Sequence, residues 1–444
     1  MVANLKKQQA EIAMPHEPSL VPVSSKSEDN HARAHQPQAC RACGTPLTHT
    51  MVDLGVQPPS NYYLRPQDLN RAEPFYPLHA LVCDDCLLVQ VEDVQTPEQL
   101  FSDYAYFSSY SDSWLRHAER YVDKMIGRFG FDAGSQVVEV ASNDGYLLQY
   151  FMQRGVPVLG IEPAANVAKV AEKKGVPSLV RFFGVETARF LVSQGKRADL
   201  LLGNNVLAHV PDLNDFMGGL KIMLAPDGVL TMEFPHLLQL MTLNQFDTIY
   251  HEHFSYFSLL AVEKAFARHG IRLFDVEELP THGGSLRIYG CHADAARPTE
   301  PAIAALKARE AAAGLDKVAT YEGFAEQVKR TKRELLKFLV EAKEAGKHVV
   351  GYGAPAKGNT LLNYCGVRGD FLDYTVDASP HKQGLYLPGT HIPVHAPEKI
   401  FETKPDYVLI LPWNIKDEIV EKMGGIKAWG GKFVVPIPQV AVLD

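Results

Sequence analysis

The sequence predicts an α/β fold built on two doubly wound sheets, with a small cysteine-containing module ahead of them. Strands and helices alternate from Val137 to about residue 290, which is the pattern of a parallel sheet covered by helices. A second unit of strand, glycine turn and helix begins after Gly346. Two Cys-x2-Cys pairs, at residues 40–43 and 83–86, precede both sheets. These observations predict three folded parts.

The bulk properties of the chain agree with several domains and exclude some partners. Its 444 residues exceed what one hydrophobic core usually supports. There are 44 basic and 52 acidic residues, a formal net charge of −8, without a lysine- and arginine-rich run, so nucleic acid and anionic membranes are poor candidate partners. No apolar run reaches the roughly 18 residues of a spanning helix, and residues 1–30 lack the apolar core of a signal peptide. We therefore expect a soluble, cytoplasmic protein.

Composition divides the chain into four segments. Residues 1–38 are rich in Gln, Pro, Ser and charge, with almost no apolar periodicity, and are predicted to be a disordered tail. Residues 39–100 form the cysteine-containing module. The central α/β domain is expected at residues 101–295 and the C-terminal α/β domain at residues 300–444.

The elements of the central domain follow one another at short intervals. A helix after Ser113 leads into the strand VVEV at residues 137–140. Further strands are expected at residues 157–162, 178–182, 198–203, 228–233, 271–279 and 285–290. The helices between them are expected at residues 165–174, 185–194 and 212–223. Gly283-Gly284 joins the last two strands, which predicts an antiparallel edge. Residues 300–345 are then expected to be helical.

The two cysteine pairs predict a structural metal site. Each Cys-x2-Cys pair places two thiolates on one side of a metal ion, and four thiolates suit tetrahedral zinc. A redox pair or four unrelated buried thiols are the alternatives, but a redox pair needs no second copy. Four protein ligands leave no open coordination position for chemistry. The predicted ligands are Cys40, Cys43, Cys83 and Cys86, whereas Cys291 and Cys365 are expected to be core residues.

The turn after the first strand of the central domain, in VVEVASNDGYLL, is a candidate cofactor site. Glu139 is followed by Ala141, Asn143 and Gly145, so two glycines of the usual acidic-x-Gly-x-Gly-x-Gly turn are missing. The turn has less room for a diphosphate, but it can admit the sulfonium and carboxylate of S-adenosylmethionine. Glu162 ends the second strand, where an acidic side chain accepts both ribose hydroxyls.

Further candidates follow the fourth strand. Asn204, Asn205 and His209 in GNNVLAHV are expected at the carboxyl edge of the sheet, where ligands lie in open α/β folds. The cofactor interpretation competes with a turn that binds no ligand, and a histidine in this place is more often a packed or capping residue.

The stretch IYHEHFSYFS, residues 249–258, concentrates groups that can handle protons. Methyl transfer to oxygen or nitrogen requires little beyond a lone pair, whereas transfer to carbon requires a carbanion. A C–H bond becomes sufficiently acidic beside a carbonyl, with a base in reach and a donor for the enolate oxygen. Two alternatives stay open: a metal site at His251, Glu252 and His253, or a buried polar network. Tyr256 and Phe257 are expected to lead into a helix that Ser258 caps.

The combination of these motifs resembles the S-adenosylmethionine-dependent sugar C-methyltransferases that act on nucleotide-linked 4-keto-deoxysugars. The motifs are CxxC…CxxC, YFSSYSDSW, VEVASNDGYLL, NNVLAHV, EFPH, YHEHFSYFS and GYGAPAKGNTLLN, and the likeness covers about residues 38 to 440. It implies a zinc-binding N-terminal module, a central class I methyltransferase domain with a Rossmann-like sheet, and a C-terminal Rossmann-like domain that helps to hold the substrate nucleotide. Ala141, where the family most often has glycine, and the long N-terminal tail are departures.

The resemblance also implies roles for individual residues. In the family, Tyr-x-x-His is associated with deprotonation beside the ketone, and it falls on Tyr250 and His253. The neighbouring glutamate of the family falls on Glu252, and the histidine after strand four falls on His209. The cofactor-binding candidates are Glu139, Ala141, Asn143, Gly145, Glu162, Asn204 and Asn205. The substrate-binding candidates are Tyr106, Ser109, His236, Gly353, Lys357, Asn359 and Thr360.

The turn GYGAPAKGNTLLN of the C-terminal domain suits a diphosphate. Its glycines allow a close approach of backbone N–H groups, and Lys357 adds a cation at the start of a helix. Taken alone, this turn with Asp377 after the next strand would also suit NAD in a dehydrogenase. We favour a clamp for the nucleotide-sugar diphosphate, whose binding energy orients the sugar ring.

The predicted reaction is C-methylation, at C3 or C5, of the carbon next to the C4 ketone. His253 is expected to remove the proton, Tyr250 and His209 to stabilise the enolate or relay the proton, and Glu252 to orient an imidazole. A small-molecule O- or N-methyltransferase and an inactive methyltransferase-like scaffold remain alternatives. The resemblance also allows a monomer, because family members of this size can work as monomers.

Overall fold

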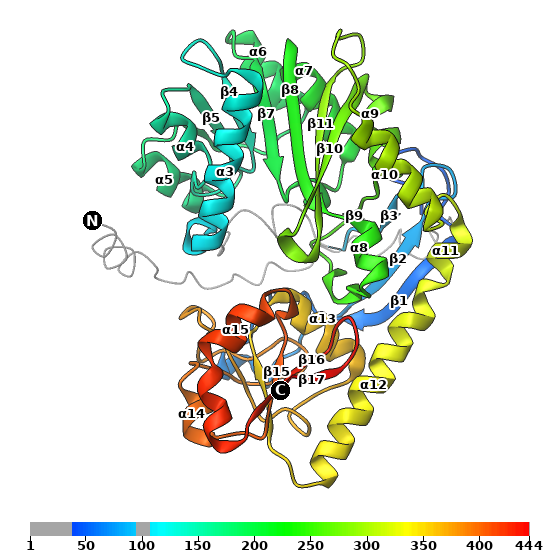
Figure 1. Cartoon of the computed structure of the whole chain (residues 1–444), viewed down its shortest axis with the longest axis vertical. Coiled ribbons are helices and arrows are strands. Elements are labelled where there is room, and N and C mark those ends of the chain that lie inside the picture. The colour runs from blue at the N-terminus through cyan, green and yellow to red at the C-terminus, as the bar shows by residue number, and fades with distance from the viewer. Residues whose placement is uncertain (1–37, 95–106, 444) are drawn as a thin grey trace. The chain divides into compact units, whose positions relative to one another are not determined.

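The structure, a computed structural model, describes residues 38–94 and 107–443. Nearly all of the predicted tail, and Tyr106, lie outside the described residues. The chain divides into residues 1–38 and residues 39–444, and all that follows concerns the second unit. Its described part contains a four-stranded, a seven-stranded and a six-stranded sheet, which Figure 1 shows as separate groups of strands.

The first sheet combines the cysteine-containing module with a strand from the central domain. Its members are β1 (His49–Gln57), β2 (Tyr76–Val82), β3 (Val89–Gln90) and β9 (Ser255–Tyr256), in the order β1-β2-β3-β9. All neighbours pair antiparallel, and Val89 lies opposite Tyr256. β9 follows directly on the YHEH segment, so this sheet fixes one end of that segment. The short helix η1 (Pro66–Asp68) lies between β1 and β2.

The central sheet has the order β10-β11-β8-β7-β4-β5-β6. Its strands are β4 (Val137–Val140), β5 (Val158–Ile161), β6 (Ser178–Leu179), β7 (Ala198–Asn204), β8 (Leu224–Pro235), β10 (Ile271–Leu279) and β11 (Ser285–His292). The first five are parallel, whereas β11 pairs antiparallel with β8 and β10. The predicted antiparallel edge is therefore confirmed. The four residues of β4 are all buried, as is usual for a strand inside a parallel sheet.

The helices of this part lie close to their predicted positions. They are η2 (Ser108–Tyr110), α3 (Asp112–Phe129), α4 (Leu148–Gln153), α5 (Ala165–Lys173), α6 (Val185–Ser193), η3 (Leu207–His209), α7 (Leu213–Met223), α8 (Leu237–Thr242), η4 (Phe246–Thr248), α9 (Leu259–Arg268) and η5 (Thr281–Gly283). The Ser258 side chain accepts a hydrogen bond from the backbone N–H of Ala261, 3.1 Å away, and caps α9 as predicted.

Two elements differ from their predictions. The strand expected at 178–182 stops at Leu179, since β6 is an edge strand and the chain leaves the sheet there. The helix expected over 300–345 is three helices, α10 (Pro301–Ala312), α11 (Val318–Glu322) and α12 (Phe324–Glu344). Gly314 follows α10 with a φ of 83°, a left-handed conformation that ends helices.

The C-terminal sheet has the order β14-β13-β12-β15-β16-β17 and is parallel except for β17. Its strands are β12 (Val349–Tyr352), β13 (Thr375–Val376), β14 (Val394–His395), β15 (Tyr407–Ile410), β16 (Lys432–Val435) and β17 (Ala441–Leu443). The helices are α13 (Ala356–Cys365), α14 (Lys399–Thr403), η6 (Trp413–Ile415), α15 (Lys416–Lys422) and η7 (Gly424–Trp429).

One buried cluster joins elements of all three parts. It contains Met51 of β1, Leu240 of α8, Leu335 of α12 and Leu361 of α13, together with Ile249 at the start of the IYHEHFSYFS stretch. Burial of each such side chain contributes roughly 1.5–3 kcal/mol to folding. The stretch is therefore packed from several directions. Cys291 and Cys365 are buried, as expected for core residues.

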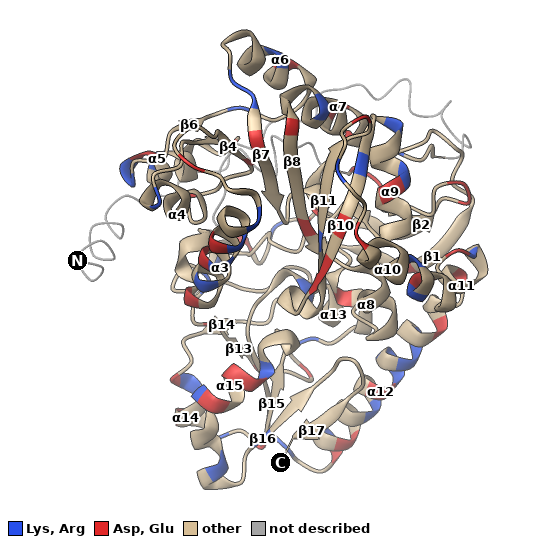
Figure 2. Cartoon of the chain, turned by 45° about the horizontal axis from the view of Figure 1, so that its top comes forward, with Lys and Arg blue, Asp and Glu red and all other residues tan. Residues whose placement is uncertain are grey.

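The charged residues are mixed in sign. Figure 2 shows Lys and Arg beside Asp and Glu along α3, α12 and α15. Within the described ranges, every helix is too short or too polar to cross a lipid bilayer.

Candidate active site

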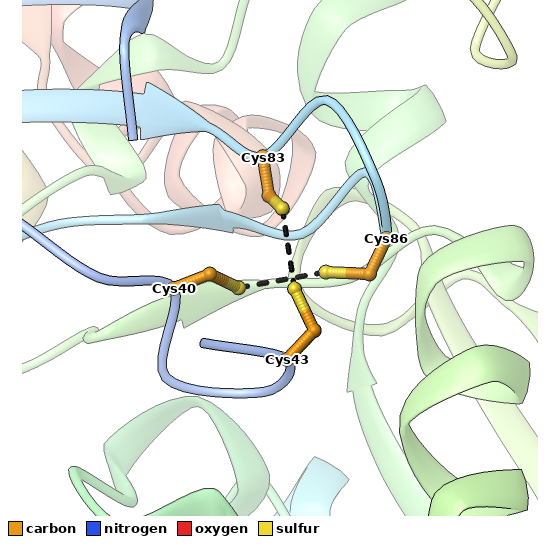
Figure 3. A group of neighbouring side chains, drawn as sticks. All are labelled: Cys40, Cys43, Cys83 and Cys86. Carbon is orange, nitrogen blue, oxygen red and sulfur yellow. Dashed lines mark hydrogen bonds between the residues drawn. The ribbon is translucent and has the colours of Figure 1, made fainter. Parts of the chain in front are cut away.

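The four cysteines predicted to bind zinc lie together (Figure 3). Their sulfur atoms all lie within 4.8 Å of one another. The Sγ atoms of Cys40 and Cys86 are 3.5 Å apart, and those of Cys43 and Cys83 are 3.4 Å apart. A tetrahedral zinc ion with bonds of about 2.3 Å requires sulfur atoms about 3.8 Å apart. Small movements of the side chains would admit the ion, so this donor set fits zinc.

The two knuckles share one backbone geometry. Gly44 donates its N–H to the Cys40 carbonyl at 2.8 Å, and Leu87 donates to the Cys83 carbonyl at 3.0 Å. Both donors have positive φ, 80° for Gly44 and 65° for Leu87. Each of the two Cys-x2-Cys pairs is therefore held by its own tight turn, and the two turns are of the same type.

The candidate cofactor turn follows β4. The φ angles of Ala141, Asn143 and Gly145 are 57°, 49° and 73°. The two missing glycines thus fall on left-handed positions, which glycine adopts without strain and asparagine tolerates better than alanine. At Gly145, a Cβ atom would lie 2.9 Å from the Val176 side chain, so glycine is required there by contact as well.

Glu162 holds this turn at the end of β5. Its carboxylate accepts the backbone N–H groups of Asn143 and Ala164, both at 2.9 Å. Burial raises the pKa of Glu162. The C-terminal domain repeats the arrangement: Asp377 accepts the N–H groups of Ala354 at 2.7 Å and Ser379 at 2.8 Å. Each α/β half therefore has an acidic residue that braces its own glycine turn.

The remaining cofactor candidates line the same edge of the sheet. Glu139 is fully buried, and burial raises its pKa well above the ordinary value, while a hydrogen bond from Tyr146 opposes the shift. The Tyr146 hydroxyl is also 3.5 Å from Nδ2 of Asn204. Asn205 is left-handed, with a φ of 54°, and donates its backbone N–H to the Glu233 carbonyl at 2.7 Å. A buried carboxyl group on β4 and two asparagines at the end of β7 thus belong to neighbouring strands.

Ser109, a substrate candidate, lies against the cofactor turn. Its N–H donates to the Asp144 carboxylate at 3.3 Å, and its hydroxyl accepts from Lys174 at 2.5 Å. The neighbouring Ser108 N–H donates to Asn143 Oδ1 at 3.0 Å. The segment before α3 is therefore fastened to this turn.

Tyr250 and His253 form a hydrogen-bonded pair. The Tyr250 hydroxyl is 2.7 Å from Nε2 of His253, and Nδ1 of the same ring is 3.0 Å from the carbonyl of Thr248. A carbonyl only accepts, so Nδ1 carries the proton and Nε2 is the acceptor. This tautomer turns the basic nitrogen toward Tyr250.

His209 completes the group. Its ring centroid is 4.7 Å from that of His253. Burial lowers the pKa of His209 to about 4. Burial and the neighbouring His209 hold the pKa of His253 well below its ordinary value. Both imidazoles are therefore neutral at pH 7 and able to accept a proton.

Glu252 and His251 have other partners than those expected. Oε1 of Glu252 accepts a hydrogen bond from Nδ2 of Asn61 at 2.6 Å, so the bond found for this carboxylate is to the zinc-binding module and not to an imidazole. His251 directs Nε2 to the carbonyl of Pro77, 3.1 Å away. His251 and His253 thus face different partners, which argues against a shared metal ion. Among the described residues, only the four cysteines form a group suited to a metal.

Three of the predicted substrate ligands are buried and bonded within the protein. His236 is 1% exposed and pairs through Nε2 with Glu310 at 2.7 Å. Nδ2 of Asn359 donates to the carbonyl of Ser60 at 2.6 Å, and the Thr360 hydroxyl donates to the carbonyl of Ile249 at 3.1 Å. These side chains fasten the domains together, and their geometry does not support the predicted contacts with substrate.

Gly353 and Lys357 stay near the turn of the C-terminal domain. Gly353 has a φ of 90°, and a Cβ atom there would lie 2.4 Å from the Pro412 ring. Nζ of Lys357 bonds to Asn414 and lies 4.0 Å from the ring centroid of Trp413. Lys357 is the cation of this turn.

The sequence motifs did not identify a pocket of about 560 Å³ between α3, the β10–β11 turn and η6. Its lining includes Trp114, His117, Arg120, His282, Arg287 and Asn414. Trp114 stacks on His117 with centroids 4.9 Å apart and meets His282 edge-on at 5.2 Å. His282 is left-handed with a φ of 55°, a conformation uncommon for histidine.

A buried carboxylate supports the wall of this pocket. Glu233 is 2.9 Å from Nε2 of His117 and 2.6 Å from the Arg287 guanidinium, and it accepts from the Thr281 hydroxyl at 3.0 Å. Burial acts to raise the pKa of Glu233, but the hydrogen bond from His117 and the charge of Arg287 outweigh it and lower the pKa. Glu233 is the first residue of the EFPH motif, whose histidine, His236, is the substrate-binding candidate.

Three family models match the chain. Residues 40–101 match a model described as "Putative zinc binding domain", residues 114–276 a "Methyltransferase domain", and residues 280–438 a "C-methyltransferase C-terminal domain". Together they cover most of the described residues.

Two similar proteins of known name are both methyltransferases, but only one of them is similar over nearly the whole chain. The C-methyltransferase NovU of Streptomyces niveus is 37% identical over 405 residues, which are 91% of this chain and 96% of NovU. The ubiquinone biosynthesis O-methyltransferase of Chelativorans sp. (strain BNC1) is 28% identical over 116 residues, 24% of this chain and 46% of the relative. Among solved structures, the magnesium protoporphyrin IX methyltransferase of Synechocystis PCC 6803 with bound SAM matches at 14% identity and a TM-score of 0.31. That match covers 40% of this chain and 79% of the other.

Proposed function

This chain belongs to the C-methyltransferase family that includes NovU, and on that premise we propose that it methylates the carbon beside the ketone of a nucleotide-linked 4-keto-deoxysugar. The single observation that carries this proposal is the hydrogen bond between Tyr250 and His253 beside His209. Methyl transfer to carbon needs a base, whereas transfer to a heteroatom does not.

Several predictions from sequence are confirmed by this membership. The chain is an S-adenosylmethionine-dependent C-methyltransferase with a class I methyltransferase fold and a zinc-binding N-terminal module. Its substrate is a small molecule. The domain limits 39–100, 101–295 and 300–444, a cytoplasmic location, and methylation at C3 or C5 belong to our proposal.

The cofactor supplies an electrophilic methyl group on its sulfonium when it is bound. Glu162 would accept the ribose hydroxyls, and the turn at Ala141, Asn143 and Gly145 would face the amino-acid end, with Glu139, Asn204 and Asn205 beside it. The buried carboxyl group of Glu139 supports this assignment, because a buried carboxyl group without a ligand is costly.

We propose that the proton of the ring carbon passes through Tyr250 to His253. The Tyr250 oxygen takes the proton from carbon as its own proton moves to Nε2 of His253, 2.7 Å away. The C–H electron pair becomes the enolate. The cofactor, when bound, would supply the methyl group to this ring carbon and would be left as S-adenosylhomocysteine. His209 would hydrogen-bond the enolate oxygen from its place 4.7 Å from His253. A neutral imidazole is a competent acceptor, and the lowered pKa of His253 keeps it neutral.

The nucleotide would occupy the pocket of about 560 Å³ and the adjoining turn of the C-terminal domain. Arg120 on the pocket wall and Lys357, bonded to the lining residue Asn414, provide cations for a diphosphate. Trp114 offers an aromatic face to a base or sugar. The N-terminus of α13 faces the same turn.

Transfer of label tests this proposal. The enzyme is incubated with methyl-labelled S-adenosylmethionine and a panel of nucleotide-linked 4-ketosugars, with the matching 4-hydroxy sugars as controls. Label bound to carbon in the ketosugars alone is the expected result. Label on oxygen or nitrogen, or no label with any ketosugar, would refute the proposed substrate and reaction.

A further inference from the structure

The helix η4, directly before the Tyr250–His253 pair, is held by the C-terminal domain at two points. Nε1 of Trp413 donates to Oδ2 of Asp247 at 2.7 Å. The hydroxyl of Thr360 donates to the carbonyl of Ile249 at 3.1 Å, just after η4 ends. Asp247 is fully buried, although nothing in its sequence neighbourhood marks it as functional. A buried carboxylate is costly unless it is hydrogen-bonded, and the Trp413 indole supplies such a bond.

The same indole ring also contacts Lys357, the cation of the turn GYGAPAKGNTLLN in the C-terminal domain. Nζ of Lys357 lies 4.0 Å from the ring centroid of Trp413, within the range of a cation–π interaction. Burial lowers the pKa of Lys357 to about 8 and raises that of Asp247 to about 6, so both are mainly charged at pH 7. Trp413 therefore lies between a partly exposed cation and a buried anion.

Asp247 also directly precedes Thr248, whose backbone carbonyl orients the imidazole of His253. The next residue, Thr248, accepts the hydrogen bond from Nδ1 of His253 at 3.0 Å. Phe246, on the other side, packs edge-on against Tyr364 of α13 at 5.4 Å. A displacement of Asp247 would thus move the carbonyl that fixes the imidazole.

We propose that Asp247 is a positioning residue. Through its bond to Trp413, it couples the binding of a ligand beside Lys357 to the alignment of Tyr250 and His253. The inference rests on the proposed function, since it takes a nucleoside diphosphate as the ligand of Lys357. A bound diphosphate attracts the ammonium group of Lys357 away from the indole face. Loss of that cation from the ring alters the strength of the hydrogen bond that Trp413 donates to Asp247. Binding energy from the remote nucleotide is then used to align the catalytic base, His253, with Tyr250.

Two substitutions separate the parts of this connection. Trp413→Phe keeps an aromatic face for Lys357 but removes the donor to Asp247. Asp247→Asn keeps an acceptor for Trp413 but removes the charge. Asp417→Asn is the matched control, because Asp417 is 92% exposed on the neighbouring helix α15 and pairs with Lys416.

Steady-state kinetics with the ketosugar nucleotide give the first readout. We expect Trp413→Phe and Asp247→Asn to lower kcat by about 10- to 100-fold, the scale of a misplaced catalytic group, with KM for the nucleotide sugar within about twofold. The control should retain wild-type values. A rise in KM with an unchanged kcat, or no change in either variant, would overturn the coupling.

A readout without turnover separates this inference from the proposed function. Uridine diphosphate or thymidine diphosphate is added to enzyme labelled with ¹⁵N-histidine, and the His253 ring nitrogens are followed by NMR. We expect the diphosphate to shift them in the wild type and not in Trp413→Phe, with equal diphosphate affinity by calorimetry. Equal shifts in both proteins, or none in the wild type, would refute the coupling. A shift in an enzyme that methylates no ketosugar would refute the proposed substrate and leave the coupling standing.

Discussion

The hydroxyl of Tyr250 lies 2.7 Å from Nε2 of His253, while Nδ1 of that imidazole is bonded to the Thr248 carbonyl. One ring nitrogen is thus fixed by the backbone, and the other is directed at a phenol. This relationship makes the hydroxyl, and not the imidazole alone, the expected point of contact with the substrate carbon.

Removal of the hydroxyl tests this relay. Tyr250→Phe should slow exchange of the ring-carbon proton by about 10²-fold or more, the usual contribution of a positioned acid or base. The rate is measured by NMR in deuterated solvent. Tyr110→Phe is the control, since Tyr110 is 56% exposed. Wild-type exchange in Tyr250→Phe would leave His253 as the direct base.

Loss of zinc should weaken the fold and then the activity. Cys86→Ser should bind less zinc, melt at a lower temperature than wild type and lose methyl transfer, because the module also holds Glu252 through Asn61. Zinc content by mass spectrometry and a melting curve measure this. Cys291→Ala should keep its zinc, since Cys291 is outside the cysteine group. Full zinc content in Cys86→Ser would contradict the assignment.

The alanine in the cofactor turn should be a site of strain. Ala141 has a φ of 57°, and release of a left-handed alanine is worth about 1 kcal/mol. Ala141→Gly should therefore raise the free energy of unfolding in urea by about that amount. Ala188→Gly, in the interior of α6, should lower it by roughly 1 kcal/mol. A destabilised Ala141→Gly would show that the turn is not strained.

Stability should fall in weak acid. The pKa of His209 drops from 6.5 to about 4 on folding, so below pH 6.5 the unfolded chain binds a proton that the folded chain refuses. The stability that this histidine contributes above pH 6.5 is lost as pH falls toward 4, by roughly 3 kcal/mol at most. His209→Asn should flatten the profile of unfolding free energy over that range. An unchanged slope would mean that His209 already protonates near its ordinary pKa.

Patterns of buried residues made much of the fold predictable. Short apolar runs, set between glycine turns and predicted helices, located each strand of the central sheet. The Gly283-Gly284 turn indicated its antiparallel edge, which the antiparallel pairing of Leu279 with Ser285 confirms. The spacing of the cysteines likewise indicated a zinc site, because two thiolates two residues apart can share a metal.

Polar contacts between distant segments could not be predicted in this way. Asn61 and Glu252 are 191 residues apart, and Asp247 and Trp413 are 166 apart. Periodicity reports which face of an element is buried, but not which polar group it meets there. His236 is an example: its place after β8 follows from the sequence, but its contact through Nε2 with Glu310 on α10, at 2.7 Å, does not. The roles of Tyr250, His253 and His209 remain predictions.

Exchange of the ring-carbon proton without methyl transfer tests the central claim most directly. A nucleotide-linked 4-ketosugar is incubated in deuterated buffer with the enzyme and S-adenosylhomocysteine, which has no methyl group to give. We predict deuterium next to the ketone with the wild type, and at least about 10²-fold slower exchange with His253→Asn, at equal S-adenosylmethionine affinity. Exchange by His253→Asn at the wild-type rate would contradict the account.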